Sequence, residues 1–526
     1  MSQDECAPAE ASKIESSSGD APPSTTPTPG HAVNPQPGHD ESPYPALADR
    51  AFARAAGSEP VDGNAVRLLL DARENYPAWL DALRGAENTI LFESYIIDDD
   101  DVGREFGEAL ATKARAGVDV RVVCDWLGSR NAGALESLLT AAGAHVRVFN
   151  RPRLDSPLGW ISRDHRKTIA VDGRTGFVSG LCVSAKWQGD AARMMEPWRD
   201  TGVEIRGPAV LELERAFADV WQACGGNALP ADRYGATYRG ALAGDVRLRV
   251  IAGAPNGTGT YRLDLVIASL AHRQLWLTDA YFVGTAAYVQ ALAAAARDGV
   301  DVRLLVPGAS DIPALSLVSR AGYRALLEAG VRVFEWNGTM LHAKTAVADG
   351  LWARIGSTNL NIASWMGNYE LDVAIEDQQF CEAMAAQYEI DLTKSTEIVL
   401  AGRSRVRLAE SRAGPAARRA RSGSAGRVAA GAVSVGSALG AALTNRRALG
   451  AAESGLLAKV SAGAIGFAIV AALWPRVVAW PLALLGAWLG IAWLTKAYGL
   501  RRGARNRGSS AGPAVADPGR SGGKGG

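Results

Sequence analysis

The sequence has few cysteines and almost no net charge. Its five cysteines are scattered, odd in number and without the spacing of a metal site. This argues against a disulfide framework and for a reducing compartment. The formal net charge of +1 gives the whole chain no preference for nucleic acid. The first residues lack a positive start followed by an apolar run, so we expect no conventional signal peptide.

Histidine is also scarce, yet two of the six histidines lie in the same sequence frame. The frame is a histidine, any residue, a lysine, four residues and an aspartate. One copy contains His165, Lys167 and Asp172, and the other contains His342, Lys344 and Asp349. A single His-x-Lys pair arises by chance, but two full copies indicate a functional repeat. The apolar runs 168–171 and 345–348, each followed by Asp-Gly, are typical of buried strands that enter turns.

The repeated residues suit phosphodiester chemistry. Residues i and i+2 of a strand share a face, so each histidine is expected to point the same way as its lysine. A neutral histidine can attack phosphorus and form a covalent intermediate, and a protonated one can give its proton to the leaving oxygen. The lysines can stabilise charge on the non-bridging oxygens. Because these groups supply the positive charge, we expect neither a metal nor a cofactor.

These motifs resemble the signature of the phospholipase D superfamily, and the resemblance extends over roughly residues 64–400. The segment Gly356-Ser357-Thr358-Asn359 is similar to the family's Gly-Ser-x-Asn, which implies that Ser357 and Asn359 hold phosphate oxygens. Glu370 stands where the family has an acid that orients a motif histidine. Three segments of the first half resemble bacterial cardiolipin synthases specifically, namely 172–178, 198–201 and 206–210. The second of these segments offers Asp200 as a second orienting acid.

One segment departs from the family pattern. The family's Gly-Gly-x-Asn reads Ser179-Gly180-Leu181-Cys182 here, which leaves Gly180 as a candidate for substrate binding. Cys182 replaces the usual amide, and a thiol is a weaker hydrogen-bond donor. The half-site built on the second motif is therefore the more complete. The family's usual order implies that His165 is the nucleophile and His342 the general acid, although the two motifs are too alike for the sequence itself to assign them.

Strands alternate with helices in the same order in both halves. The segment 299–304 is nearly identical in pattern to 117–122, and the segment 329–334 corresponds to 142–149. This pattern predicts an α/β fold of two tandem phospholipase D-like layered α/β domains that form a pseudo-dimer, plus C-terminal membrane helices. The expected divisions are a disordered tail (1–48), the two domains (49–232 and 233–400), a basic linker (401–427), a membrane-associated helical segment with a hairpin (428–500) and a disordered basic tail (501–526).

Two loops of the first half call for an interpretation. The four acids at 98–101 are expected to form a solvated loop that leads into a helix over 102–116, because acids favour helix N-termini. The stretch 184–198 contains two methionines and two tryptophans, which is unusual for a loop. It either packs onto its own domain or forms a lip that meets acyl chains. Regular structure is expected to begin near Asn64.

Two apolar runs, 460–474 and 477–494, follow an arginine-rich linker and precede a second basic segment. The second run is near the length of a spanning helix. We expect a helical hairpin, spanning or re-entrant, with one spanning helix plus an interfacial one as the alternative. Basic residues on both sides place both ends in the cytoplasm.

The resemblance implies a phosphatidyltransferase of the cardiolipin synthase type. It would join two phosphatidylglycerols into cardiolipin and release glycerol through a phosphohistidine intermediate. The expected partners are phospholipid substrates and the bacterial inner (cell) membrane, with the catalytic domains on the cytoplasmic side. No nucleic acid is expected, and the oligomeric state stays open. The alternatives are a hydrolytic phospholipase D or another phosphodiesterase, with a nuclease disfavoured, and a membrane scaffold with a dead site.

Overall fold

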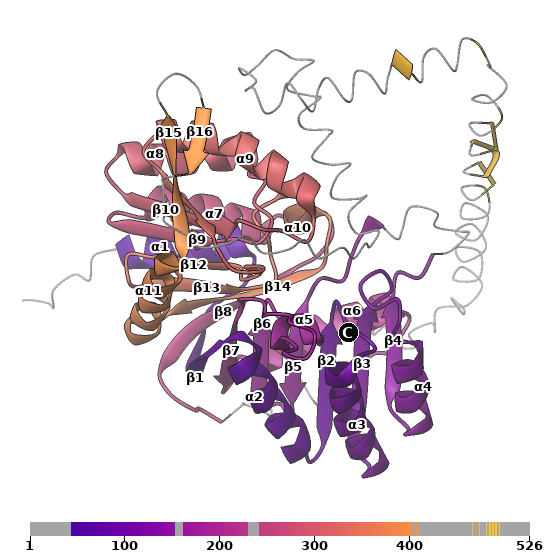
Figure 1. The fold of residues 1–526 in the computed structure, drawn as a ribbon. Helices are drawn as coiled ribbons and strands as arrows, with labels where there is room; N and C mark the ends of the chain where they lie inside the picture. Colours follow the sequence, from indigo (N-terminus) through magenta and orange to yellow (C-terminus); the bar gives the residue numbers. More distant parts are fainter. Residues whose placement is uncertain are drawn as a thin grey trace, which may run out of the picture. The chain divides into compact units, whose positions relative to one another are not determined.

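The computed structural model describes residues 44–152, 161–229, 241–401 and 405–408, with isolated positions between 465 and 494. A short helix, α1 (Tyr44–Ala56), precedes two series of elements that repeat one order (Figure 1). The first series is β1 (Val61–Leu70), α2 (Asp71–Gly85), β2 (Thr89–Ser94), α3 (Asp101–Arg115), β3 (Asp119–Asp125), α4 (Gly133–Ala141), β4 (His145–Phe149), β5 (Lys167–Val171), β6 (Thr175–Ser179), α5 (Ala185–Gln188), β7 (Thr201–Arg206) and α6 (Val210–Ala223).

The second series begins twenty-odd residues later and follows the first element by element. It comprises β8 (Val246–Gly253), α7 (Gly259–Leu270), β9 (Gln274–Thr278), α8 (Ala286–Arg297), β10 (Asp301–Pro307), α9 (Pro313–Glu328), β11 (Arg332–Trp336), β12 (Thr345–Ala348), β13 (Trp352–Gly356), α10 (Ile362–Met366), β14 (Glu370–Glu376) and α11 (Gln378–Thr393). Two further strands, β15 (Ser395–Ala401) and β16 (Arg405–Leu408), have no counterpart in the first series.

The sixteen strands of the described residues form one sheet, and apart from β15 and β16 at one edge its order is symmetric about the β8–β1 pair. On one side lie β7, β6, β5, β2, β3 and β4, and on the other lie β14, β13, β12, β9, β10 and β11. In each half the three strands joined by helical crossovers are parallel and the others are antiparallel. The antiparallel β1–β8 pairing joins the halves at Val61–Leu248 and Asn64–Val246. The expected α/β repeat is thus present as two half-sheets in continuous contact.

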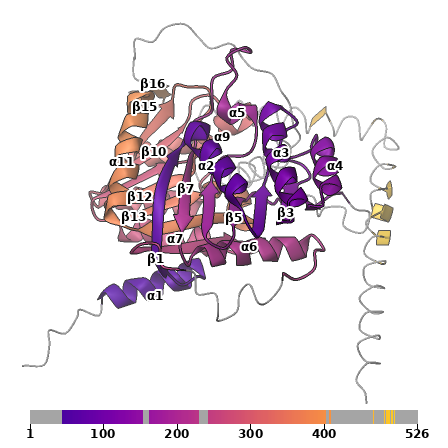
Figure 2. The ribbon, with the colours of Figure 1, turned by 90° about the horizontal axis from the view of Figure 1, so that it is seen from below.

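Buried apolar side chains form an outer core in each half and a shared core between the halves. One outer core lies under α2 and α3 and the other under α7, α8 and α9. The shared core combines residues of α6 and α11 with the inner faces of both half-sheets. In Figure 2, α3 and α4 lie together at one side of the sheet and α11 at the other. The shared core fixes the two half-sheets against each other, and the two motifs adjoin strands β5 and β12 of those half-sheets.

Helix α3 shows how the local sequence sets an element. Val102, Phe106 and Leu110 recur at helical spacing and are buried. Asp100 is the N-cap and accepts a hydrogen bond from the backbone N–H of Gly103 at 2.9 Å. Asp98 accepts one from the ammonium of Lys186 at 2.8 Å. The acidic run therefore leads into the helix as expected.

The structure corrects the sequence argument at both ends of the repeat. Regular structure begins well before Asn64, because Tyr44–Ala56 form α1, from which Phe52 packs against the outer core of the second half. Strand β15 continues past residue 400 and pairs with β16. The helix was missed because residues 44–56 follow a Pro- and Ser-rich stretch and their apolar positions are mostly alanine.

The predicted tails and the basic linker lie almost wholly outside the described residues, as does the predicted membrane segment 428–500 apart from isolated positions. Those isolated positions between 465 and 494 are helical, and the large apolar side chains among them are exposed. Within the described part of the chain, no helix is both long and apolar enough to cross a membrane.

Candidate active site

The histidine of each motif lies just ahead of its strand, in a segment that pairs with the other half. His165 precedes β5, and both His342 and Lys344 precede β12, so these residues are not strand residues as the sequence argument held. Short parallel bridges join Asp164 to Tyr369 and Arg199 to Leu341. The backbone N–H groups of His165 and His342 donate to the carbonyls of Tyr369 at 2.9 Å and Arg199 at 2.7 Å. Each motif is therefore positioned by the half to which it does not belong.

The carboxylate of Glu370 holds the imidazole of His165. His165 Nδ1 lies 2.9 Å from Oε2 and 3.1 Å from Oε1 of this acid. Because a carboxylate only accepts, Nδ1 carries the proton and Nε2 is left with its lone pair. Glu370 also accepts from the hydroxyl of Ser357 at 2.6 Å and from the amide of Asn368 at 3.2 Å. The hydroxyl of Ser357 is thus bonded to the orienting acid, a different placement from the phosphate contact that the resemblance implied.

Asp200 holds His342 in the same way from the first half. Its Oδ2 lies 2.8 Å from His342 Nδ1 and accepts from the indole N–H of Trp187 at 2.8 Å. The backbone N–H of Thr201 donates to Oδ1, also at 2.8 Å. The rings of Trp187 and Trp198 lie 5.2 Å and 5.6 Å from the imidazole of His342. The indole N–H of Trp187 donates to Asp200 as the hydroxyl of Ser357 donates to Glu370.

The stretch 184–198 has a buried part, as expected for a loop packed onto its own domain, and an exposed part, as expected for a lip. Trp187 is 1% exposed and belongs to the core, as expected for a loop packed onto its own domain. Met194, at the tip of the same stretch, is 92% exposed and has a positive φ of 51°. Sequence reasoning singled out this stretch for its composition, but it did not predict that Trp187 would bond the acid that holds His342.

Both lysines are buried beside their histidines. The ammonium of Lys167 donates to the carbonyl of His165, and that of Lys344 to the carbonyl of His342. Lys344 Nζ also lies 2.9 Å from Nδ1 and 3.0 Å from Nε2 of His342. An anionic substrate that enters this site meets two cationic side chains with little competing solvent.

Two tyrosines that the sequence argument missed lie beside the two histidines of the candidate site. Tyr95 lies edge-on to His165, with ring centroids 4.9 Å apart, and Lys167 Nζ is 5.2 Å from the centre of the same ring. Tyr281 repeats the arrangement at 5.9 Å from His342, with Lys344 at 6.0 Å. Both tyrosines follow the first parallel strand of their half, β2 and β9, and this position in the repeat is the signal that would have pointed to them.

Burial sets the protonation of the resting site. Burial, opposed by Glu370, lowers the pKa of His165 to about 4. Burial and the neighbouring Lys344 lower the pKa of His342 to about 3. Lys344 also lowers the pKa of His165, and Lys167 that of His342, so each motif acts on the other's imidazole. Both imidazoles are therefore neutral near pH 7, and both orienting carboxylates are ionised.

The second half-site contains a further buried acid that acts on Lys344. Asp279, fully buried at the end of β9, accepts from the backbone N–H groups of Leu360 and Tyr281 at 2.9 and 3.1 Å. Burial raises its pKa to about 7. Burial lowers the pKa of Lys344 to about 8, while the carboxylates of Asp200 and Asp279 act to raise it. The charge of Lys344 is therefore sensitive to pH near neutrality.

Gly180 makes room for the orienting acid. A Cβ atom on Gly180 would lie only 2.1 Å from Asp200 Oδ1. Its neighbour Cys182 is 1% exposed, and burial raises the pKa of its thiol, so the thiol is protonated. Asn359, the matching residue of the second half, is 4% exposed, and its Oδ1 has no hydrogen-bond partner within the described structure. The amide N–H of Asn359 donates to the hydroxyl of Ser364 at 3.5 Å, so the amide oxygen is the atom left for a ligand that donates a hydrogen bond.

Asp172 and Asp349, which the sequence argument grouped with the catalytic residues, lie at the far ends of β5 and β12. Their carboxylates accept from the backbone N–H groups of residues 87–89 and 272–274 respectively, at 2.7–2.9 Å. A strand rises about 3.3 Å per residue, so a whole strand separates each acid from its histidine. These two acids fix the turns that lead into β2 and β9, and the structure does not bring them to the imidazoles.

Among the described residues, no group of three or more His, Cys, Asp or Glu side chains is arranged to hold a metal ion. The convergent groups of the site are instead imidazoles paired with carboxylates, together with ammonium groups. This donor set suits nucleophilic and acid–base chemistry on an anion.

Comparison with known proteins identifies the family. A family profile described as "Cardiolipin synthase, PLD-like domain" matches residues 79–221 and 266–392, which include both motifs and both orienting acids. Cardiolipin synthase of Alkalihalophilus pseudofirmus is 31% identical over 351 residues, covering 66% of this chain and 70% of the relative. The chain belongs to the cardiolipin synthase family of phospholipase D-like proteins. The predicted resemblance is thus confirmed.

Other members of the cardiolipin synthase family match over similar lengths. Cardiolipin synthase A of Pseudomonas aeruginosa is 32% identical over 374 residues, covering 68% of this chain and 73% of that protein. Cardiolipin synthase 2 of Bacillus anthracis is 32% identical over 340 residues, and the match covers 65% of its length. A crystal structure of phosphatidylserine synthase from Haemophilus influenzae superposes with a TM-score of 0.52 at 15% identity, covering 66% of this chain and 91% of that one. At this identity the likeness concerns the fold alone.

Proposed function

We propose that this protein is a phosphatidyltransferase of the cardiolipin synthase type, which joins two phosphatidylglycerols into cardiolipin and releases glycerol. The observation that carries the proposal is the pair of imidazole–carboxylate contacts, each made between the two halves, beside two buried lysines. Membership of the cardiolipin synthase family supports a phospholipid as the substrate. No metal and no cofactor takes part in the proposed steps.

In the first step, Nε2 of neutral His165 attacks the phosphorus of one phosphatidylglycerol. The bond from phosphorus to the headgroup glycerol oxygen breaks, and a phosphatidyl–histidine bond forms. His342, protonated when the anionic lipid is bound, gives its proton to the leaving glycerol. Glu370 stabilises the positive charge that develops on His165, and both lysines stabilise the non-bridging oxygens. The order of the two histidines follows the family.

In the second step, the headgroup hydroxyl of another phosphatidylglycerol attacks the phosphorus. His342 now takes the proton of that hydroxyl, and the bond between phosphorus and His165 breaks. The product is a dimeric phospholipid, and both histidines return to their starting forms. Water can take the same place as the hydroxyl, so transfer requires that the site exclude water and hold the acceptor near the phosphorus.

We further propose that the enzyme works at the bacterial inner membrane, with its catalytic halves on the cytoplasmic side. The apolar runs at 460–474 and 477–494, with arginines on both sides, support this placement. A tether of this kind raises the effective concentration of lipid headgroups at the site. The basic linker would also bind anionic headgroups.

The decisive experiment supplies the purified protein with phosphatidylglycerol in bilayers and measures both products. We expect one glycerol for each dimeric phospholipid, and added glycerol should reverse the reaction because both sides are similar diesters. His165→Ala and His342→Ala should each abolish both directions. Formation of mainly phosphatidic acid, with no dimeric lipid under any condition, would replace the synthase by a hydrolase.

A further inference from the structure

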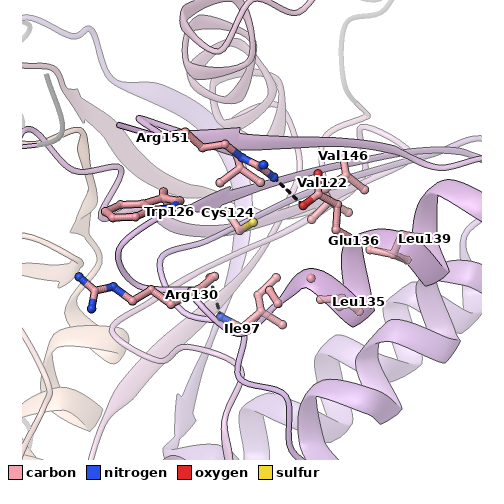
Figure 3. Close-up of a pocket in the computed structure, with 14 residues that line it drawn as sticks. Ile97, Val122, Cys124, Trp126, Arg130, Leu135, Glu136, Leu139, Val146 and Arg151 are labelled. Atoms are coloured by element: carbon pink, nitrogen blue, oxygen red, sulfur yellow. Dashed lines mark hydrogen bonds and ion pairs between the residues drawn. The ribbon is translucent and has the colours of Figure 1, made fainter. Parts of the chain in front are cut away.

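A cavity of about 190 Å³ lies between α4 and the outer face of β3 and β4 (Figure 3). None of the residues discussed above as site residues lines it. Its apolar walls are formed by Ile97, Val122, Cys124, Leu135, Leu139, Val146 and Val148. Burial raises the pKa of the Cys124 thiol to about 12, so this group is protonated and behaves as an apolar wall.

The polar residues of the cavity carry charge. Arg151 forms an ion pair with Glu136 at 2.6 Å, drawn as a dashed line in Figure 3. The guanidinium of Arg130 lies over the ring of Trp126, 5.3 Å from its centre. Arg130 and Arg151 are exposed, whereas Val122 and Cys124 are buried. The cavity therefore combines an apolar interior with exposed guanidinium groups, as expected for a site that takes an apolar tail.

The cavity is connected to the candidate active site through a short chain of contacts. The hydroxyl of Ser129, on its rim, accepts from the N–H of Ile97 at 2.9 Å and donates to the carbonyl of Tyr95 at 3.1 Å. The ring of Tyr95 in turn contacts His165. Strand β4 is three places from β5 in the sheet, and three spacings of about 4.8 Å give about 14 Å. A phosphate at His165 therefore lies outside the cavity, and only an extended tail attached to it is long enough to span a separation of about 14 Å.

We propose that this cavity binds part of one acyl chain of the phosphatidylglycerol whose phosphate lies at His165. The inference rests on the proposed function and adds a site for chain recognition to it. At about 190 Å³ the cavity is smaller than the roughly 300–1,000 Å³ of sites that enclose a whole drug-sized ligand. It therefore takes a segment of one chain, while the other chain stays in the lipid phase.

Gly133 offers a test that does not disturb the core. This residue lines the cavity at the start of α4, and a Cβ atom added to it would meet nothing within 4 Å. The side chain added in Gly133→Leu therefore begins in open space beside the cavity, without a clash in the protein. Gly322 in α9 has the same open surroundings and lies far from the cavity in sequence, so Gly322→Leu is the matched control. Val148→Phe fills the cavity from the opposite wall.

The measurement compares phosphatidylglycerol with two long chains and with two six-carbon chains at equal surface concentration in mixed micelles. We expect Gly133→Leu and Val148→Phe to lower kcat/KM for the long-chain lipid about tenfold or more, on the scale of a misfitted methylene in an apolar pocket. The short-chain lipid should be converted at nearly the wild-type rate. Gly322→Leu should leave both rates unchanged.

An unchanged ratio of long-chain to short-chain rates in both cavity variants would overturn the inference, and so would an equal loss for both lipids. A second readout does not depend on turnover. Phosphatidylglycerol with a photoreactive group at one chain end should label peptides within residues 122–151 of the wild type and less so in Gly133→Leu. Labelling elsewhere would refute the chain site, whereas labelling here without any dimeric product would refute only the synthase proposal.

Discussion

Each imidazole of the site is held by a carboxylate that lies 142 or 205 residues away in the sequence. The histidines and lysines could be found from the sequence because their spacing is local and repeated. Glu370 and Asp200 were found only through the family resemblance, since no local pattern marks them. Trp187, Tyr95 and Tyr281 were missed, because their contacts with the histidines arise only when the halves fold.

The indole N–H of Trp187 is a buried donor to Asp200, so its removal should change how Asp200 holds the imidazole of His342. We expect Trp187→Phe to lower kcat by roughly 10- to 100-fold, from the loss of about 1.5–3 kcal/mol for a hydrogen bond to a charged group. Trp365→Phe is the matched control, because its indole bonds a different buried acid, Asp264, at 3.0 Å. The contact is not functional if the two variants have equal kcat values and equal thermal stability.

The alkaline limit of activity should depend on Asp279. The charge of Lys344 is lost as pH rises through its pKa of about 8, and Asp279 acts to raise that pKa. Removal of the carboxylate in Asp279→Asn lowers the pKa further, so the ammonium loses its proton at a lower pH. The alkaline limb of the kcat profile should therefore move to lower pH.

The control for this shift is Asp264→Asn, which removes a buried carboxylate that bonds Trp365 instead of facing Lys344. Its pH profile should match that of the wild type once the fraction of folded protein is taken into account. If the alkaline limb of the kcat profile stays in place in Asp279→Asn, or moves equally in both variants, the titration of Lys344 does not determine that limb.

Short segments, more than long elements, hold the side chains of the candidate site. Alternating apolar residues predicted β5 and β12, but the histidines lie ahead of these strands in segments that pair with the other half. Periodicity reports which residues share a face, but it contains no information about a partner segment two hundred residues away. The helix expected over 102–116 is present as α3 (Asp101–Arg115), because its buried positions recur with a period of about 3.6 residues over several turns.

The junction between β6 and α5 gives a test at this scale. Gly180→Ala would bring a Cβ atom to 2.1 Å from Asp200 Oδ1, so the carboxylate must move away from His342. We expect kcat to fall by about 10²-fold, the scale of a misplacement of about 1 Å. Gly322→Ala in α9 is the matched control, because the added methyl group there meets nothing within 4 Å. Full activity in Gly180→Ala would mean that Asp200 has room to move without affecting the reaction.

The whole molecule is organised by its internal symmetry. The order of strands on one side of the β8–β1 pair repeats on the other, and the two motif segments occupy equivalent places. Repetition in the sequence was enough to predict this pseudo-dimer, because each half has its own alternation of strands and helices. The added strands β15 and β16 have no counterpart in the first half, so repetition could not predict them.

The described part of the chain indicates where the catalytic body can be separated from the C-terminal apolar runs. Strand β16 ends at Leu408 and pairs with β15 over four residue pairs. A chain cut after residue 410 should therefore keep the complete sheet, whereas one cut after Leu400 loses β16 and should unfold at a lower temperature. Thermal unfolding of the two truncated proteins checks this difference.

The longer of these truncated proteins also tests the membrane tether. Without the runs at 460–474 and 477–494 it should bind phosphatidylglycerol vesicles much less than the full chain, as measured by co-flotation. It should still act on short-chain phosphatidylglycerol in micelles, because both motifs and both orienting acids are retained. If the truncated protein floats with vesicles as completely as the full chain, the tether lies in the body. The exposed tip at Met194 would then be the first segment to replace, with Met194→Ser expected to release the protein.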